Sequence, residues 1–115
     1  TVPMITEKML VRKVSSFVFD DPIVTGAKIC DELKCKADVI VCLSHIGLTQ
    51  DRRLAVAAQG IHLIVGGHSH SLLDTGELVG TVRIVQAGSW AKWFGDVTLH
   101  LAGSIITSSA TTNVL

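Results

Sequence analysis

Two histidines separated by a single residue, His68 and His70, are the side chains of this sequence best suited to chemistry. They follow an apolar run and a pair of glycines at residues 64–67, and a third histidine, His45, follows another apolar run that ends at Leu43. Neutral imidazoles are good ligands for divalent transition metals, with metal–nitrogen bonds of about 2.0–2.1 Å. Flexible glycine backbone beside a rigid strand can bring such ligands together, so the three histidines predict a metal site.

The elements around the histidines predict how they meet. Residues 37–43 form a nearly unbroken apolar run, which is typical of a strand buried on both faces, and residues 61–65 predict the next strand. Between them, residues 50–59 predict a helix with Thr49 as its N-cap. A right-handed strand-helix-strand unit makes the two strands parallel, so both end at one edge of the sheet, about 4.8 Å apart if they are neighbours. His45 and His68 are then expected to converge.

The remaining sequence completes an α/β fold. Residues 15–19 predict a strand, and residues 22–36 a helix that Asp21 caps and a proline begins. After residue 80, glycines divide the tail into apolar or β-branched runs at residues 81–87, 93–101 and 104–112, which predict antiparallel strands. His62 and His100 fall inside predicted strands and are interpreted as packing or surface residues.

Composition limits the functions that this chain can have. Its 115 residues allow one domain, and ten basic against ten acidic residues give no field that would attract nucleic acid or an anionic membrane. Hydrophobic residues make up 48% of the sequence, an excess for so small a domain, which suggests that a partner chain or the rest of a larger domain covers part of it. No apolar run approaches the roughly 20 residues that span a bilayer, and residues 1–13 do not resemble a signal peptide.

The three cysteines predict no disulfide and no zinc site. Cys30 and Cys35 lie on different faces of the predicted helix, and Cys42 lies in a strand. The spacing also lacks the Cys-x2-Cys pattern of structural zinc sites. Reduced, buried thiols are the favoured interpretation.

Three ordered motifs carry a resemblance to a known family. They are ADVIVCLSHIG at residues 37–47, GIHLIVGGHSH at residues 60–70 and VQAGSWAKWFG at residues 85–95. Together they resemble the calcineurin-like metallophosphoesterases, most closely the branch of 5′-nucleotidases and 2′,3′-cyclic-nucleotide phosphodiesterases. The resemblance runs from about Lys13 to Leu101 and implies half of a two-sheet β-sandwich flanked by helices.

This resemblance also implies the chemistry of the site. His45 and His68 would bind one divalent metal and His70 a second, with Zn, Mn or Fe as the metals that suit such ligands. The reaction would be hydrolysis of a phosphomonoester, with a nucleotide as the expected substrate. Many relatives are exported or periplasmic, but no signal peptide in this sequence decides the compartment.

The sequence departs from the family pattern in its missing ligands. It contains no Asp-x-His pair, and its only asparagine, Asn113, is not followed by histidine. Gly95-Asp96 lies after the histidine motifs, in the β-rich tail, where it does not match the bridging aspartate of the family. Residues 1–115 are therefore interpreted as the carboxyl-terminal part of one metallophosphoesterase domain, inactive without an amino-terminal half or a partner chain. The alternative is a non-catalytic remnant or a binding subunit that completes another chain.

Two further motif matches are weaker. Residues 72–76, LLDTG, resemble the run around an aspartic-protease aspartate, but Glu77 stands where a small residue is expected and few residues follow. A polar turn between strands is the favoured interpretation. The run GSWA at residues 88–91 lacks the second glycine of a nucleophile elbow.

Overall fold

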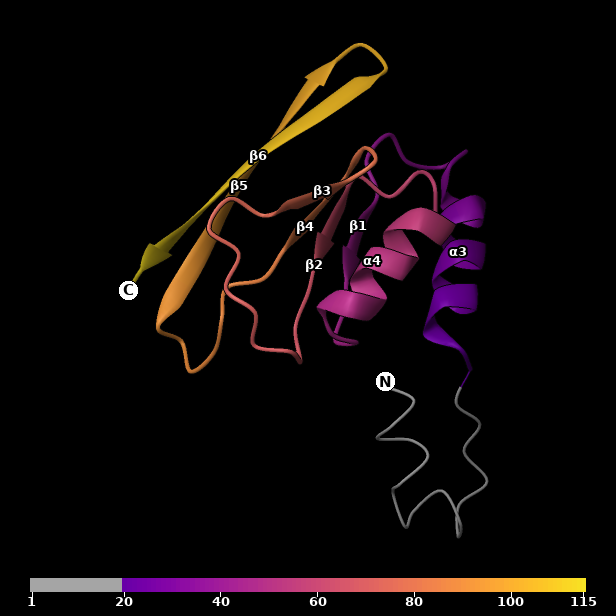
Figure 1. The fold of residues 1–115 in the computed structure, drawn as a ribbon. Coiled ribbons are helices and arrows are strands. Elements are labelled where there is room, and N and C mark those ends of the chain that lie inside the picture. The colour runs from indigo at the N-terminus through magenta and orange to yellow at the C-terminus, as the bar shows by residue number, and fades with distance from the viewer. Residues whose placement is uncertain (1–19) are drawn as a thin grey trace, which may run out of the picture.

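The computed structural model of this chain describes residues 20–115 as a small sheet with helices on one side and a long hairpin on the other (Figure 1). The predicted strand at residues 15–19 lies outside the described residues. In chain order the elements are α3 (Pro22–Leu33), β1 (Val41–Leu43), α4 (Leu48–Ala57), β2 (Leu63–Val65), β3 (Glu77–Val79), β4 (Val82–Val85), β5 (Trp93–Ala102) and β6 (Ile105–Val114). The predicted α/β architecture is confirmed.

The four-stranded sheet has the order β1-β2-β4-β3. Strands β1 and β2 are parallel neighbours, as predicted, with Cys42 opposite Ile64. The prediction of only antiparallel strands in the tail is wrong for β4, because β4 runs parallel to β2 and antiparallel only to β3. Strand β3 was not predicted; it follows the bend at residues 74–75 and turns into β4 through Gly80, whose φ of 61° suits glycine.

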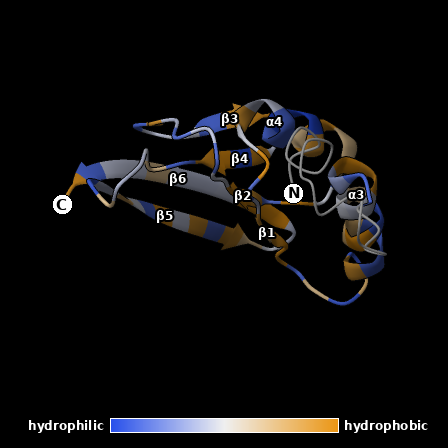
Figure 2. Ribbon diagram, turned by 90° about the horizontal axis from the view of Figure 1, so that it is seen from below, coloured by the Kyte–Doolittle hydropathy of each residue, from blue (hydrophilic) through white to orange (hydrophobic). Residues whose placement is uncertain are grey.

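One face of this sheet is packed against the helices. The register aligns Cys42, Ile64 and Ile84 in a row, and both isoleucines are 0% exposed. They share one hydrophobic core with Cys30 of α3 and Leu54 of α4. Figure 2 shows the hydrophobic colouring of β1, β2 and β4 that this core requires.

The opposite face is covered unequally. The next row of the register aligns Leu43, Val65 and Val85, which are 81%, 37% and 9% exposed. Burial of β1 on both faces was predicted and is wrong. The reason is that β1 is an edge strand, and the described residues place no layer over its outer face.

The two helices begin differently. Asp21 caps α3 as predicted, since its Oδ1 accepts from the backbone N–H groups of Ile23 at 2.7 Å and Val24 at 3.1 Å. The helix ends at Leu33, three residues before the predicted end. Thr49 was predicted to cap the second helix, and this is wrong: α4 begins at Leu48, after Gly47, with no side-chain cap from its own turn.

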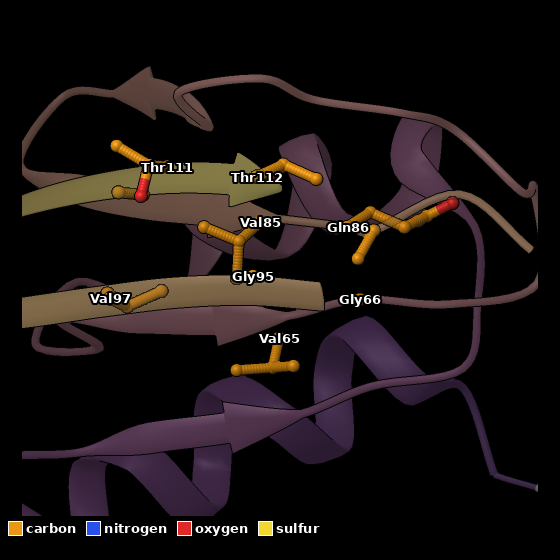
Figure 3. A pocket seen from close by; sticks show the side chains of 10 residues that line it. Val65, Gly66, Val85, Gln86, Gly95, Val97, Thr111 and Thr112 are labelled. Carbon is orange, nitrogen blue, oxygen red and sulfur yellow. The ribbon is translucent and has the colours of Figure 1, made fainter. Parts of the chain in front are cut away.

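The hairpin of β5 and β6 confirms the last two predicted strands and pairs Trp93 with Val114 at its open end. Arg83 of β4 ties it to the sheet, donating from Nε to Ser108 Oγ at 3.1 Å and from its guanidinium to the Ser108 carbonyl at 2.8 Å. A cavity of about 230 Å³ remains between the layers, with Val65 and Val85 on one wall and Val97 on the other (Figure 3).

The cysteines are free thiols, as predicted. Cys30 is buried, but Cys42 is only half-buried and Cys35 is exposed, so the prediction of buried thiols is wrong for Cys35. Cys35 is exposed because α3 ends before it, in a turn outside the core. Among the described helices, none has the length and apolar character that crossing a membrane requires.

Candidate functional site

Three parallel strands deliver their following loops to one edge of the sheet. The loop after β1 carries His45, the loop after β2 carries His68 and His70, and β4 is followed by Gln86. The rings of His45 and His68 meet with their centroids 5.3 Å apart and their planes at 75°. The predicted convergence of these two histidines is confirmed.

This separation suits two ligands of one metal. A metal–nitrogen bond of about 2.0–2.1 Å puts an imidazole centroid roughly 3.2 Å from the metal. Two such rings at a tetrahedral angle would be separated by about 5.2 Å, close to the observed 5.3 Å. His45 is exposed and His68 is half-buried, so solvent and ions can reach the pair.

His70 lies apart from this pair, against a different aromatic residue. Its ring stacks edge-on with Trp90, with centroids 6.3 Å apart and planes at 64°. Trp90 follows β4 by five residues and is 82% exposed. Among residues 20–115, no group of three or more histidine, cysteine, aspartate or glutamate side chains is arranged to hold a metal. The described residues thus bring two histidines together but form no complete coordination shell.

The backbone of the second histidine loop is strained. His68 has a φ of 77° and His70 a φ of 55°, in the left-handed region that residues with a Cβ rarely adopt. Such conformations cost of order 1–3 kcal/mol each and persist where surrounding contacts determine them, often at functional sites. The loop conformation is therefore imposed by its neighbours.

The two glycines before His68 lie close to neighbouring side chains. A Cβ on Gly67 would lie 2.8 Å from Nδ1 of His45. A Cβ on Gly66 would collide with Oδ2 of Asp51. The Gly-Gly pair thus lets the second loop approach both the other histidine loop and helix α4.

Asp51, in the first turn of α4, is a functional candidate that no motif in the sequence indicates. It is 0% exposed, and its Oδ1 accepts from the hydroxyl of Ser44, next to His45, at 2.5 Å. Among the described residues, its Oδ2 is a buried atom without a hydrogen-bond partner. Burial raises the pKa of this carboxyl above its ordinary value, and the bond from Ser44 opposes that shift.

Ser69 links the histidine loop to α4. Its Oγ accepts from the backbone N–H of Leu48 at 3.1 Å, which satisfies a free donor at the start of the helix. It also lies 3.0 Å from Oγ of Ser71. This long-range cap explains why α4 needs no capping side chain from its own turn, and no local sequence pattern predicts it.

The fold and the histidine pair define an α/β protein with histidine-bearing loops at the carboxyl edge of its parallel strands. No family model matches the chain. It is 38% identical over 66 residues to the Bacillus subtilis metallophosphoesterase YunD, covering 57% of this chain and 14% of that protein. It is 33% identical to the trifunctional nucleotide phosphoesterase YfkN of Bacillus subtilis, covering 87% of this chain and 7% of that protein. Human 5′-nucleotidase is 35% identical, with 82% of this chain and 20% of that protein covered.

These similarities confirm the resemblance found in the motifs: the homologues of this chain are metallophosphoesterases and 5′-nucleotidases. The chain spans only 7% to 20% of the length of these three relatives. The name of YunD describes a metallophosphoesterase, and the names of the other two describe a nucleotide phosphoesterase and a 5′-nucleotidase.

Proposed function

We propose that this chain supplies the histidine side of a two-metal site that hydrolyses phosphate esters of nucleotides. His45 and His68 bind one metal and His70 binds the other. The observation that carries the proposal is the 5.3 Å pairing of the His45 and His68 rings at the carboxyl edge of the sheet. Divalent zinc, manganese or iron, when bound, would polarise the phosphoryl group and lower the pKa of water.

The chain's own residues would orient and separate the two ligand groups. Ser44 and Asp51 hold the loop of His45 against α4, while Trp90 lies against His70. The exposed His45 and half-buried His68 leave room for a phosphate ester to approach. The nucleotide substrate is supported by the names of the homologues.

We further propose that residues 1–115 form the carboxyl-terminal part of a larger metallophosphoesterase domain. The support is the open face of the sheet, where exposure rises from 9% at Val85 to 81% at Leu43 with distance from the hairpin. An amino-terminal half, from the same protein or from a partner chain, would cover that face and supply the remaining ligands. The chain alone would then be inactive.

The test compares the chain alone with the chain mixed with the amino-terminal half of a homologous metallophosphoesterase. Metal content and hydrolysis of a nucleoside monophosphate are measured in both preparations. The proposal expects hydrolysis only in the mixture, and its loss in His68→Ala. A mixture that forms a stable complex but binds no divalent metal, or unchanged hydrolysis in His68→Ala, contradicts it. A stable, metal-free complex would instead favour the alternative that this chain is a binding subunit that completes another chain.

A further inference from the structure

Gln86 is a buried polar side chain at the same sheet edge as the histidines. It follows β4 directly and is 4% exposed. A polar side chain buried at the end of an apolar strand is costly unless its hydrogen bonds are made. The partners of Gln86 therefore indicate what the residue is for.

Within residues 20–115, the side-chain hydrogen bonds of Gln86 go to the loop after β2. Its Oε1 accepts from the backbone N–H of Ser71 at 2.5 Å and from the hydroxyl of Ser69 at 3.0 Å. Its Nε2 donates to the carbonyl of Gly67 at 3.3 Å. The three partners are alternate residues of the loop, and the two histidines are the residues between them.

The chemistry of these partners specifies an amide. The backbone N–H of Ser71 can only donate and the carbonyl of Gly67 can only accept, so the residue must offer an acceptor and a donor at one end. A carboxylate in place of Gln86 would keep the acceptor and lose the donor. An apolar side chain of similar size would lose both.

We infer that Gln86 is the positioning residue for both histidines of this loop. By holding the residues before, between and after them, its amide maintains the left-handed backbone at His68, with φ 77°, and at His70, with φ 55°. Those backbone angles determine where the imidazoles stand. The inference rests on the proposed function only in assigning metal binding to the histidines.

The experiment uses the whole chain and two measurements. One is the hydrogen-exchange rate of the Ser71 backbone amide, which donates to Gln86. This rate reports the strength of that hydrogen bond in the absence of metal. The other is the dissociation constant for zinc alone. In Gln86→Ala, we expect Ser71 exchange to speed up at least about tenfold. We expect zinc affinity to fall by roughly 10–100-fold, as for other outer-shell partners of metal ligands.

The control is Gln59→Ala, the same change at an exposed glutamine, which should leave both measurements unchanged. If Gln86→Ala does not fold, Gln86→Glu takes its place, because it keeps the acceptor for Ser71; it should give a smaller increase in exchange and still weaken zinc binding. Exchange at Ser71 as slow as in the unchanged chain, in a folded variant at Gln86, overturns the inference. If the unchanged chain alone binds no zinc, the mixture with the amino-terminal half tests the proposed function, and Ser71 exchange alone decides the role of Gln86.

Discussion

The two histidine loops at the carboxyl edge of the sheet are held in different ways. The loop after β1 is short, and Ser44, beside the exposed His45, anchors it through its hydroxyl to Asp51 and through its backbone N–H to the carbonyl of Val65. The loop after β2 is longer and strained, and it is fixed by the backbone N–H of Leu48 in α4 and by the side chain of Gln86 at the end of β4. The difference suggests that the second loop sets the geometry of the site, and that His45 adjusts to it.

The largest effect expected from this comparison is on folding, in Gly66→Ala. The added methyl group would collide with the carboxylate of Asp51, which is fully buried. Overpacking of this kind costs about 1–3 kcal/mol. Urea unfolding should show that loss, while Gly95→Ala, where no atom lies within 4 Å of the new Cβ, should change stability by less than about 0.5 kcal/mol. Equal stability of the two variants would show that the second loop is not tightly packed against α4.

Gly67→Ala should separate binding from folding. The added methyl group would lie 2.8 Å from Nδ1 of His45, an exposed ring that can swing away. Stability should therefore change by less than about 1 kcal/mol, but the displaced ring should weaken zinc binding by about 10–100-fold. Calorimetric zinc titration of this variant and of Gly95→Ala provides the check. Unchanged zinc affinity would mean that zinc binding does not depend on the position of the His45 ring.

The anchor of the first loop should appear in the pH dependence of stability. Burial raises the pKa of Asp51 above its ordinary value of 3.8 in the folded chain, so the folded state binds this proton more tightly than the unfolded state. The contribution of Asp51 to the free energy of unfolding is therefore fully present below pH 3.8 and is lost as the pH rises through the raised pKa.

The measurement is urea unfolding of the chain and of Asp51→Asn across this pH range. The unchanged chain should lose stability relative to Asp51→Asn as the pH rises. The exposed Asp96 of β5 provides the matched control, Asp96→Asn, which should follow the unchanged chain. If the free energy of unfolding changes with pH equally in the chain and in Asp51→Asn, Asp51 does not anchor the loop as a buried carboxyl.

Trp90→Ala should have the smallest effect on stability. The indole is 82% exposed, so its loss should change the free energy of unfolding by no more than about 0.5 kcal/mol. The ring resonances of His70 should shift because their aromatic neighbour is gone, while those of His45 should not. A shift at His45 as large as that at His70 would mean that the two ligand groups are not separate.

Local sequence patterns predicted the parts of this fold that depend on neighbouring residues. The cap of Asp21, the parallel pairing of β1 and β2 and the meeting of His45 with His68 all followed from spacing and from the handedness of the strand-helix-strand unit. The parallel course of β4 could not be predicted in this way. It depends on β3, a strand of three residues that is too short to show an alternating pattern.

The hydrogen bonds that hold the histidine loop after β2 could not be predicted from local patterns either, because they join residues that are far apart in the sequence. Ser69 caps a helix that begins 21 residues earlier, and Gln86 reaches a loop 15 to 19 residues earlier. These bonds can form only when the ends of β1, β2 and β4 lie at the same edge of the sheet. A glutamine at the end of an apolar strand was the one signal in the sequence that could have suggested them.

The central claim is that His45 and His68 bind the same metal ion. The most direct test is a zinc titration of the chain followed through the imidazole NMR signals of both residues, repeated with His45→Ala. Both rings should respond with one shared midpoint, and His45→Ala should weaken the response of His68 at least about tenfold. Separate midpoints for the two rings, or a His68 response that His45→Ala leaves unchanged, would contradict it.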